Sequence, residues 1–297
     1  MSFSSEVKQE LCRNAIQRSC CACAEMYGIL LCCHTFTPQE IRIITESEPF
    51  AQRLPRLLDR AFGLDFDRLP AEGEQKFIFQ ITQEDKLRKI VDSFGYDPSQ
   101  SSVLHINFGL LEEDCCRSAF LRGVFLSGGS ITDPSKHYHL EMATSHSQAS
   151  REMSALLTDM GRSPRQVTRG GYQVTYFKTC DQIEDLLTVI GAPISAMELM
   201  NLRVEKDLRN DVNRRVNCEA ANLDKAVDAA QEQLTAIRIL YELDRVESLP
   251  DKLKETIILR ETYPELTLAQ LAAEFDPPLT KSCLNHRLRK LIELSKQ

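Results

Sequence analysis

Residues 119–130 read Ala-Phe-Leu-Arg-Gly-Val-Phe-Leu-Ser-Gly-Gly-Ser, an apolar run with one glycine, Gly123, near its middle. The pattern predicts a helix that ends at the Gly-Gly-Ser sequence. A glycine inside a helix costs roughly 1 kcal/mol relative to alanine. We therefore expect another segment of backbone to pack closely against Gly123.

The same pattern occurs 95 residues earlier in the chain. At this offset Cys20-Cys21 matches Cys115-Cys116, Ala24 matches Ala119, Gly28 matches Gly123, Ile29 matches Val124 and Leu31 matches Leu126. Ser19 and Asp114 precede the paired cysteines at equivalent places and are predicted N-caps. Self-similarity at a long, fixed offset indicates a structural repeat. The sequence thus predicts a duplicated half-domain, packed through Gly28 and Gly123.

The charge of the chain is unevenly distributed. The 297 residues carry a net charge of −7, which argues against indiscriminate nucleic-acid binding. Residues 279–297 contain five Lys/Arg and one acid, a local excess of +4 that leaves the remainder at −11. A basic C-terminal segment on an acidic body is a localised electrostatic footprint.

Composition predicts a soluble intracellular protein, which we expect in the cytoplasm and associated with the nucleoid. The N-terminal residues are polar and lack the apolar core of a secretory signal. No apolar run approaches the ~20 residues that span a bilayer. The eleven cysteines are an odd number with several adjacent, which fits reduced thiols better than a disulfide framework.

The N-terminal region is predicted to be an α+β domain, residues 1–205, with halves at about 1–98 and 99–205. In the first half, periodicity predicts helices at 2–16, 22–33, 49–62 and 83–94, with strands at 40–46, 64–69 and 76–81 and a turn at 70–73. The second half predicts strands at 130–131 and 137–143, a helix at 147–160, a hairpin of 166–169 with 172–178, and a helix at 180–190 that ends at Gly191. We read the order αββαββα twice.

The C-terminal region is predicted to be all-α. The polar, charged stretch 204–222 is interpreted as an interdomain junction, followed by an alanine-rich helix at 223–243, so that 206–248 forms a helical linker. Residues 249–297 then form three helices, at 251–262, 267–275 and 280–294.

The last two of these helices have helix-turn-helix spacing. Thr267 with Gln270 predicts a capping box, Asp276-Pro277-Pro278 ends the first helix, and a basic second helix follows. Leu284, Leu288 and Leu291 form the buried stripe of that second helix. The alternative to a DNA-binding helix is an ordinary amphipathic helix whose polar face is only exposed to solvent.

The exposed face of this helix has the chemistry of DNA recognition, because Asn pairs with adenine, Arg with guanine and Lys with phosphate. Thr280 begins the helix; we assign Ser282, Asn285, His286 and Arg289 to base edges, and Lys281, Arg287 and Lys290 to phosphates, with the alternative that Arg287 points away.

The glycine-bearing helices resemble the LAGLIDADG motif of homing endonucleases, through Met26–His34 and Leu121–Gly129. In that family two such helices cross at a pseudo-twofold axis, and the strands after them form a saddle over DNA. The family's metal-binding acids would fall at Cys33 and Gly128, neither of which is a carboxylate. The hard metal cations that promote phosphodiester hydrolysis are bound by oxygen ligands. Because both positions lack a carboxylate, we expect no nuclease activity.

Over nearly its full length the chain resembles the WhiA family of bacterial regulators, most specifically at residues 115–130, 213–224 and 279–291. In this family a degenerate homing-endonuclease domain is joined to a C-terminal helix-turn-helix. The resemblance implies a transcription factor acting in sporulation, or in cell division and chromosome segregation.

Other clusters give weaker predictions. Cys20, Cys23, Cys32 and Cys33 are candidate zinc ligands. On a single helix, at ~1.5 Å per residue, Cys23 and Cys32 would lie about 13 Å apart, which is too far to share one ion. We therefore interpret these cysteines as reduced thiols that pack as small hydrophobic side chains. The pair His137 and His139 could bind metal or simply lie on the surface. Arg209, Arg214 and Arg215 contact either phosphate or the nearby Asp207 and Asp211.

The resulting prediction is a non-catalytic, sequence-specific regulator that binds double-stranded DNA as a monomer, without cofactor or metal. Two other classes remain open. A metal-dependent nuclease is disfavoured by Cys33 and Gly128. An interaction scaffold of the division machinery would instead place the basic C-terminal helix on an acidic protein partner.

Overall fold

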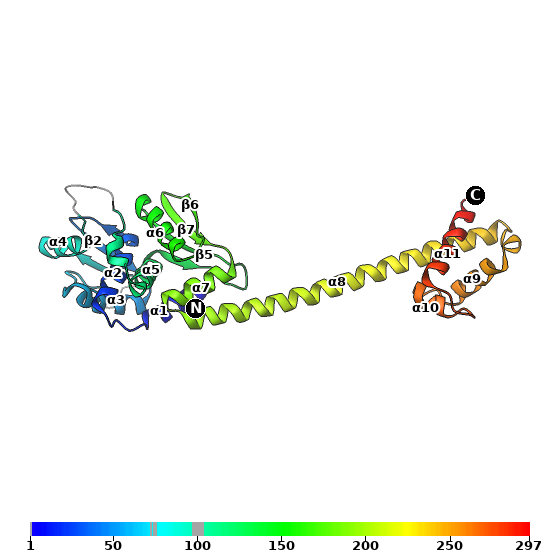
Figure 1. Ribbon diagram of the computed structural model, residues 1–297, viewed down its shortest axis with the longest axis horizontal. Helices are drawn as coiled ribbons and strands as arrows, with labels where there is room; N and C mark the ends of the chain where they lie inside the picture. Colours follow the sequence, from blue (N-terminus) through cyan, green and yellow to red (C-terminus); the bar gives the residue numbers. More distant parts are fainter. Residues whose placement is uncertain (1, 72, 74–75, 97–103) are drawn as a thin grey trace. The chain divides into compact units, whose positions relative to one another are not determined.

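The computed structural model describes residues 2–71, 73, 76–96 and 104–297 (Figure 1). The chain forms two compact units, Met1–Lys206 and Asp207–Gln297, and each is described by itself. The expected division between the repeat halves, near residues 98 and 99, and part of the expected turn at 70–73 lie outside the described residues. Among the described residues, no helix combines the length and hydrophobicity needed to cross a membrane.

The first half of unit one contains a three-stranded antiparallel sheet of order β1-β2-β3. Its elements are α1 (Phe3–Cys12), α2 (Ser19–Cys32), β1 (Thr35–Phe36), β2 (Ile41–Thr45), α3 (Glu48–Phe62), β3 (Phe77–Ile81) and α4 (Glu84–Ser93). The strand expected at 64–69 is wrong, because the described part of that stretch makes only an isolated bridge from Arg68 to Gln80. Leu69 is exposed there and Pro70 follows it, so pairing stops after one residue.

The second half has the predicted order in full. Its elements are η1 (Phe108–Leu111), α5 (Asp114–Gly128), β4 (Gly129–Ile131), β5 (Leu140–Thr144), α6 (Ser147–Asp159), β6 (Arg165–Arg169), β7 (Tyr172–Phe177) and α7 (Cys180–Ile190). The sheet order is β4-β5-β7-β6, and both predicted hairpins pair antiparallel. Gly170 and Gly171 have positive φ, as the tight β6–β7 turn requires.

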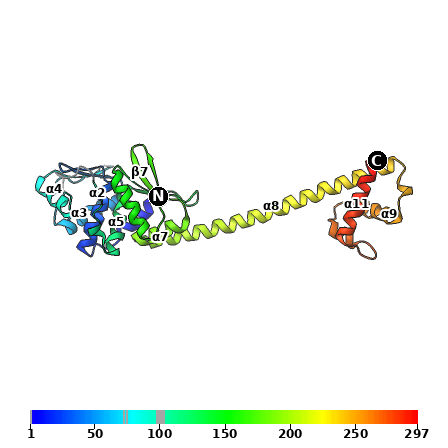
Figure 2. The same cartoon turned by 45° about the horizontal axis from the view of Figure 1, so that its top comes forward.

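Helices α2 and α5 pack against each other at the centre of the unit (Figures 1 and 2). A Cβ atom on Gly28 would overlap the carbonyl oxygen of Phe120 and lie 2.9 Å from the amide nitrogen of Val124. A Cβ atom on Gly123 would overlap the carbonyl of Glu25 and lie 3.0 Å from the nitrogen of Ile29. These contacts are exchanged by the 95-residue offset, so the two halves meet with pseudo-twofold symmetry.

Helix α2 begins three residues before the expected start at residue 22, and the N-cap positions of α2 and α5 each lie one residue before the predicted caps. Ser19 and Asp114 are the first helical residues, and the N-cap positions are Arg18 and Glu113, neither of which makes a side-chain cap bond. The offset of 95 residues is kept, so the repeat was read correctly while the caps at Ser19 and Asp114 were wrong.

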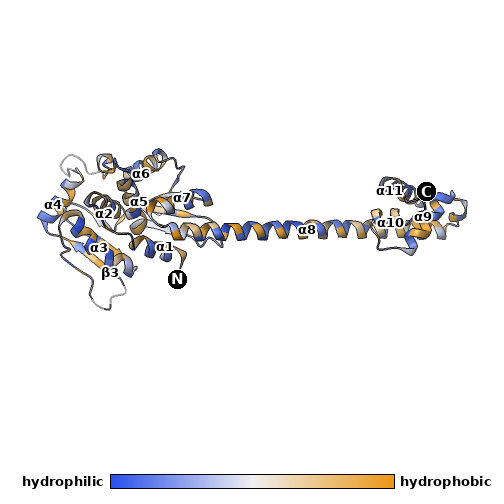
Figure 3. Cartoon of the chain, turned by 60° about the horizontal axis from the view of Figure 1, so that its bottom comes forward, coloured by the Kyte–Doolittle hydropathy of each residue, from blue (hydrophilic) through white to orange (hydrophobic). Residues whose placement is uncertain are grey.

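One helix, α8 (Pro193–Glu242), replaces the predicted junction and the helix expected to begin at residue 223. The predicted start is wrong because the polar stretch contains no proline or glycine between Pro193 and Glu242 and is rich in Leu, Glu, Lys and Arg, which favour helix. Hydrophilic and hydrophobic residues are interspersed along α8 (Figure 3).

Unit two begins within α8, at Asp207, and so contains the C-terminal part of that helix. A short 3-10 helix, η2 (Val246–Ser248), follows, and then three α-helices: α9 (Asp251–Thr262), α10 (Leu268–Ala273) and α11 (Lys281–Ser295). Its core is formed by side chains from all four helices, namely Ile237, Leu240, Ile257, Leu271, Ala272, Phe275, Leu284, Leu288 and Leu291. The predicted stripe of α11 is therefore buried as expected, and its opposite face is turned to solvent.

Candidate nucleic-acid interface

Helix α10 begins with the predicted capping box. The Thr267 hydroxyl accepts from the amide of Gln270 at 3.4 Å, and the Gln270 side chain accepts from the amide of Thr267 at 3.1 Å. These reciprocal bonds satisfy two amide groups that a helix start leaves unpaired. Buried Leu271 and Ala272 then hold the helix against the core of unit two.

The connection to α11 is short and fixed at both ends. The amide of Leu279 donates to the carbonyl of Ala272 at 2.9 Å, which ties the turn back onto α10. Thr280 is the N-cap of α11, and its hydroxyl accepts from the amide of Cys283 at 3.2 Å. Two short helices joined by a tight turn form the helix-turn-helix arrangement that the spacing predicted.

The outer face of α11 carries most of the residues that sequence reasoning assigned to DNA. Lys281, Ser282, His286 and Arg289 are exposed and Asn285 is half-buried. Within the described part of the chain, none of these five side chains makes a hydrogen bond or an ion pair. Their donors and acceptors are therefore free to meet an external partner.

Arg287 differs from the other residues that were assigned to DNA, because it has partners within unit two. Its guanidinium donates to the carbonyl of Lys252 at 3.2 Å and lies 3.5 Å from the Glu255 carboxylate. It also stacks over the Phe275 ring, with 5.5 Å to the centroid. Arg287 faces the interior of unit two because these three partners surround its stem and head group, and these contacts favour the alternative that it points away from DNA.

The remaining basic residues of this segment are partly neutralised. Lys290 lies 3.5 Å from Glu293, with half of its side chain exposed, and Lys296 lies 3.9 Å from Glu232. Lys281 and Arg289 make no ion pair among the described residues. The positive charge available to a partner is thus concentrated at these two positions, with Lys290 able to exchange Glu293 for a phosphate.

Comparison with known proteins identifies the family. The model of the WhiA C-terminal HTH domain matches residues 212–295, and the model of the WhiA LAGLIDADG-like domain matches residues 117–209. A relative from Ruminiclostridium cellulolyticum, named "Probable cell division protein WhiA", is 36% identical over 306 residues, covering 100% of this chain and 98% of its own. The chain belongs to the WhiA family.

Other matches agree with this assignment. A protein of the same name from Alkaliphilus metalliredigens is 35% identical, covering 99% of this chain and 98% of its own. The crystal structure of full-length DUF199/WhiA from Thermotoga maritima has a TM-score of 0.61 at 23% identity, covering 100% of this chain and 98% of that one. The latter likeness shows the fold: a LAGLIDADG-like domain followed by a helix-turn-helix.

In this WhiA-family chain, Cys33 and Gly128 are the two positions at which the resemblance to LAGLIDADG proteins would place metal-binding acids. Cys33 is the C-cap of α2, and its thiol donates to the Thr35 carbonyl at 3.1 Å. Burial raises the pKa of the Cys33 thiol. A Cβ atom on Gly128 would overlap the carbonyl oxygen of Ala143, so any side chain there requires β5 to move.

His139 and Arg214 each have an acidic neighbour close in the sequence. The rings of His137 and His139 lie 6.4 Å apart, before β5 rather than within it as expected, and His139 lies 3.2 Å from the Glu141 carboxylate. Arg214 lies 3.6 Å from Asp211 on the exposed surface of α8. The geometry therefore favours the surface alternative for His139 and the ion pair for Arg214.

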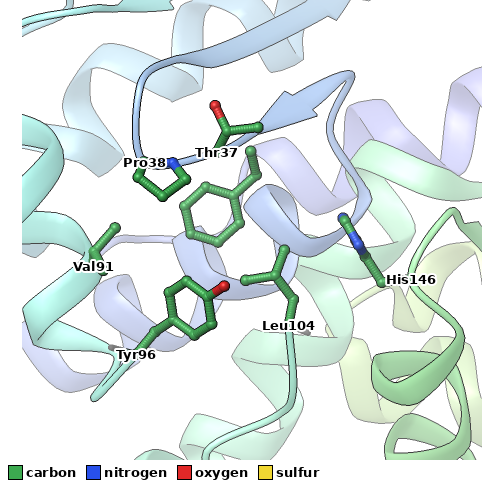
Figure 4. Close-up of a pocket in the computed structure, with 7 residues that line it drawn as sticks. Thr37, Pro38, Val91, Tyr96, Leu104 and His146 are labelled. Atoms are coloured by element: carbon green, nitrogen blue, oxygen red, sulfur yellow. The ribbon is translucent and has the colours of Figure 1, made fainter. Parts of the chain in front are cut away.

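A hollow lined by residues of both halves of unit one, drawn in Figure 4, is mainly apolar. It is lined by Phe36, Thr37, Pro38, Val91, Tyr96, Leu104 and His146. Burial lowers the pKa of His146, which favours its neutral form. No carboxylate is among the described residues that line the hollow, so these residues offer a hard cation no charged oxygen ligand.

Sequence reasoning missed one group of residues. The sulfur atoms of Cys20, Cys21 and Cys116 all lie within 4.8 Å of one another, and Cys115 adjoins them. The 95-residue offset matched Cys20-Cys21 to Cys115-Cys116, but only the pairing of the glycines was taken to mean contact in space, and the zinc hypothesis was tested along a single helix. That offset was the signal that could have placed Cys20-Cys21 beside Cys115-Cys116.

Proposed function

We propose that this protein is a sequence-specific DNA-binding transcriptional regulator acting in bacterial cell division, chromosome segregation or sporulation. The observation that carries the proposal is the outer face of α11, where Ser282, Asn285, His286 and Arg289 are turned to solvent without partners among the described residues. A basic second helix of this kind enters the major groove in helix-turn-helix proteins. The names of its relatives support the role in cell division.

The roles of individual side chains follow from hydrogen-bonding chemistry. Arg289 can donate two parallel bonds to guanine, and Asn285 can pair with the donor and acceptor of adenine. Lys281 and Lys290 supply phosphate contacts, which add affinity without sequence information. Arg287 is left out of this set because Glu255 and the Lys252 carbonyl occupy it.

We further propose that the protein has no nuclease activity, is associated with the nucleoid, and binds DNA as a monomer. Absence of cleavage is supported by the residues at Cys33 and Gly128: neither is a carboxylate, and the carbonyl of Ala143 leaves no space for a side chain at Gly128. A monomer suffices because the duplicated domain already supplies internal twofold symmetry. The acidic body then contributes shape or a partner surface.

Footprinting of the full-length protein on a pool of genomic fragments, in the presence of magnesium, tests these proposals together. We expect protected sites without strand cleavage. Arg289→Ala and Asn285→Ala should each lose about 1–3 kcal/mol of discrimination at one base position. Arg151→Ala, which removes an exposed arginine from α6, is the matched control and should leave the footprint unchanged.

Three outcomes would contradict the proposal. Unchanged footprints for both α11 variants would exclude α11 as the reading helix. Magnesium-dependent cuts would show that a nuclease site exists elsewhere. Absence of any footprint, combined with binding of an acidic protein that DNA does not displace, would favour the scaffold function instead.

A further inference from the structure

Two pairs of adjacent cysteines meet where α2 and α5 begin. Cys20 and Cys21 lie in the first turn of α2, and Cys115 and Cys116 lie in the first turn of α5. The sulfur atoms of Cys20, Cys21 and Cys116 are mutually within 4.8 Å. The Cys115 thiol interacts with both Cys21 and Cys116, so four thiols share one small volume.

The cluster follows the symmetry of the two halves. The free thiol of Cys21 interacts with the thiol of Cys115, and that of Cys20 interacts with the thiol of Cys116. The 95-residue offset exchanges these two contacts, as it exchanges the contacts of Gly28 and Gly123. The close approach of α2 and α5 at their glycines is therefore what brings the two cysteine pairs together.

Four sulfur ligands in this volume match the requirement of one metal ion. A structural zinc ion is held tetrahedrally by four thiolates at about 2.3 Å, which separates the sulfur atoms by roughly 3.8 Å. The sulfur atoms of Cys20, Cys21 and Cys116 already lie within 4.8 Å of one another, and Cys115, whose thiol interacts with Cys21 and Cys116, would supply the fourth ligand. We propose that Cys20, Cys21, Cys115 and Cys116 bind zinc and thereby join the two halves of the LAGLIDADG-like domain.

The surroundings suit a negatively charged centre. Four thiolates around one divalent cation leave a net charge of −2. Arg18 points a guanidinium nitrogen at the Cys115 sulfur, 3.7 Å away. The N-termini of α2 and α5 both lie here, and among the described residues no side chain caps either of them. Helix N-termini favour negative charge and thiolates.

The site has an entry path and differs from the position of the family's catalytic acids. Cys20 is exposed, Cys21 and Cys115 are half-buried and Cys116 is buried, so zinc can enter from the Cys20 side. Positions 33 and 128, where those acids would fall, lie at the opposite ends of the same helices. The proposed centre is thus structural and independent of phosphodiester chemistry.

Zinc uptake should release protons. Zinc binds the thiolate forms of cysteine, so thiols that are protonated in the free protein lose their protons when the ion binds.

The test uses the full-length protein, reduced and stripped of metal, titrated with Zn²⁺ against a chromophoric chelator and with Co²⁺ alone. We expect one ion per chain, and for cobalt the sulfur-to-metal charge-transfer bands of a tetrahedral thiolate site. Cys20→Ser removes one proposed zinc ligand and keeps a polar side chain at an exposed position. Loss of a residue that only supports a ligand lowers metal affinity roughly 10- to 100-fold, so loss of the ligand itself should lower zinc affinity by more than this. Cys218→Ser and Cys283→Ser, at exposed cysteines outside the cluster, should change nothing.

A Cys20→Ser/Cys115→Ser double variant removes one ligand from each half and spares buried Cys116. Circular dichroism at equal temperature checks that it remains folded. Stoichiometric zinc binding by the folded double variant would overturn the proposal, as would failure of the reduced wild-type protein to bind zinc. A Cys20–Cys116 or Cys21–Cys115 disulfide in protein that takes up no zinc after reduction would assign the cluster to thiol oxidation instead.

Discussion

The α-carbon of Gly123 lies against the main-chain carbonyl of Glu25, so closely that the carbonyl carbon would be 2.9 Å from a Cβ atom placed on Gly123. The neighbour is backbone of a packed helix and cannot rotate aside. We therefore expect Gly123→Ala to lower the free energy of unfolding of unit one by about 1–3 kcal/mol or more, the range for overpacked cores. Thermal unfolding followed by circular dichroism measures this loss.

Ser118→Ala on the same helix is the control, because Ser118 is only partly buried and alanine favours helix. Gly28→Ala should behave as Gly123→Ala does, since the two contacts are equivalent. Equal stability of the glycine variants and the control would mean that α2 and α5 cross less closely than described.

A buried ion cluster also connects the halves. The Glu25 carboxylate accepts two bonds from Arg53, at 2.6 and 2.9 Å, and one from Arg122 at 3.1 Å. Glu25→Gln leaves both guanidiniums without their counter-charge, and breaking a buried pair costs about 3–5 kcal/mol. We expect a loss of this size in urea unfolding of the full-length protein.

The pair of Glu46 and Lys76 is the matched control for Glu25. These two residues lie 3.2 Å apart with most of both side chains exposed, and exposed pairs contribute little. Glu46→Gln should therefore leave the unfolding curve nearly unchanged. A similar shift for Glu46→Gln and Glu25→Gln would contradict the importance assigned to burial.

Alanine substitution should lower the stability of unit two at Arg287 but not at Arg289. Arg287→Ala removes the bond to Lys252 and the stacking on Phe275, so unit two should lose about 1–2 kcal/mol of stability. Arg289→Ala removes no contact among the described residues and should stay within about 0.5 kcal/mol of wild type. Differential scanning calorimetry compares the two, and destabilisation by Arg289→Ala alone would reverse the assignment.

Acid should weaken unit one through Asp67. Burial raises the pKa of Asp67, but the ammonium of Lys86 and the amides of Thr82 and Gln83 donate to its carboxylate and lower the pKa overall. The stabilisation is present above the ordinary value of about 3.9 and is lost as pH falls through the lower folded value. Asp67→Asn should flatten this part of the stability profile between about pH 4 and the acid limit of folding.

Asp92→Asn is the control for this pH dependence, because Asp92 is exposed on α4. Its profile should follow wild type in a series of urea denaturation curves. If Asp67→Asn retained the full acid-dependent loss, the stabilisation would reside in other carboxylates.

Features with local chemical signals were predictable from the sequence. The cap at Thr267, the start of a helix near Thr280 and the turn at Gly170-Gly171 each depend on a few neighbouring residues, and the structure contains all of them. The paired glycines at Gly28 and Gly123 were detectable because the repeat keeps a constant offset.

Features that depend on tertiary contacts were not predictable in this way. Periodicity places Arg287 beside Leu288 at the edge of the buried stripe, but only the positions of Glu255 and Phe275 decide that it turns inward. The stretch 64–69 has strand-like composition, yet only Arg68 finds a partner in the described sheet. Likewise the polar composition of 204–222 could not distinguish an irregular junction from an exposed helix.

The crossing of α2 and α5 belongs to a single polypeptide, and this has a consequence at low abundance. An interface between two separate copies would dissociate on dilution, whereas this one has the same stability at any protein concentration. Because the two halves are joined in one chain, they need not have identical sequences or structures. Among the described residues, the first half contains a three-stranded sheet and the second half a four-stranded sheet. A few molecules per cell would retain an intact, asymmetric domain without needing to find one another.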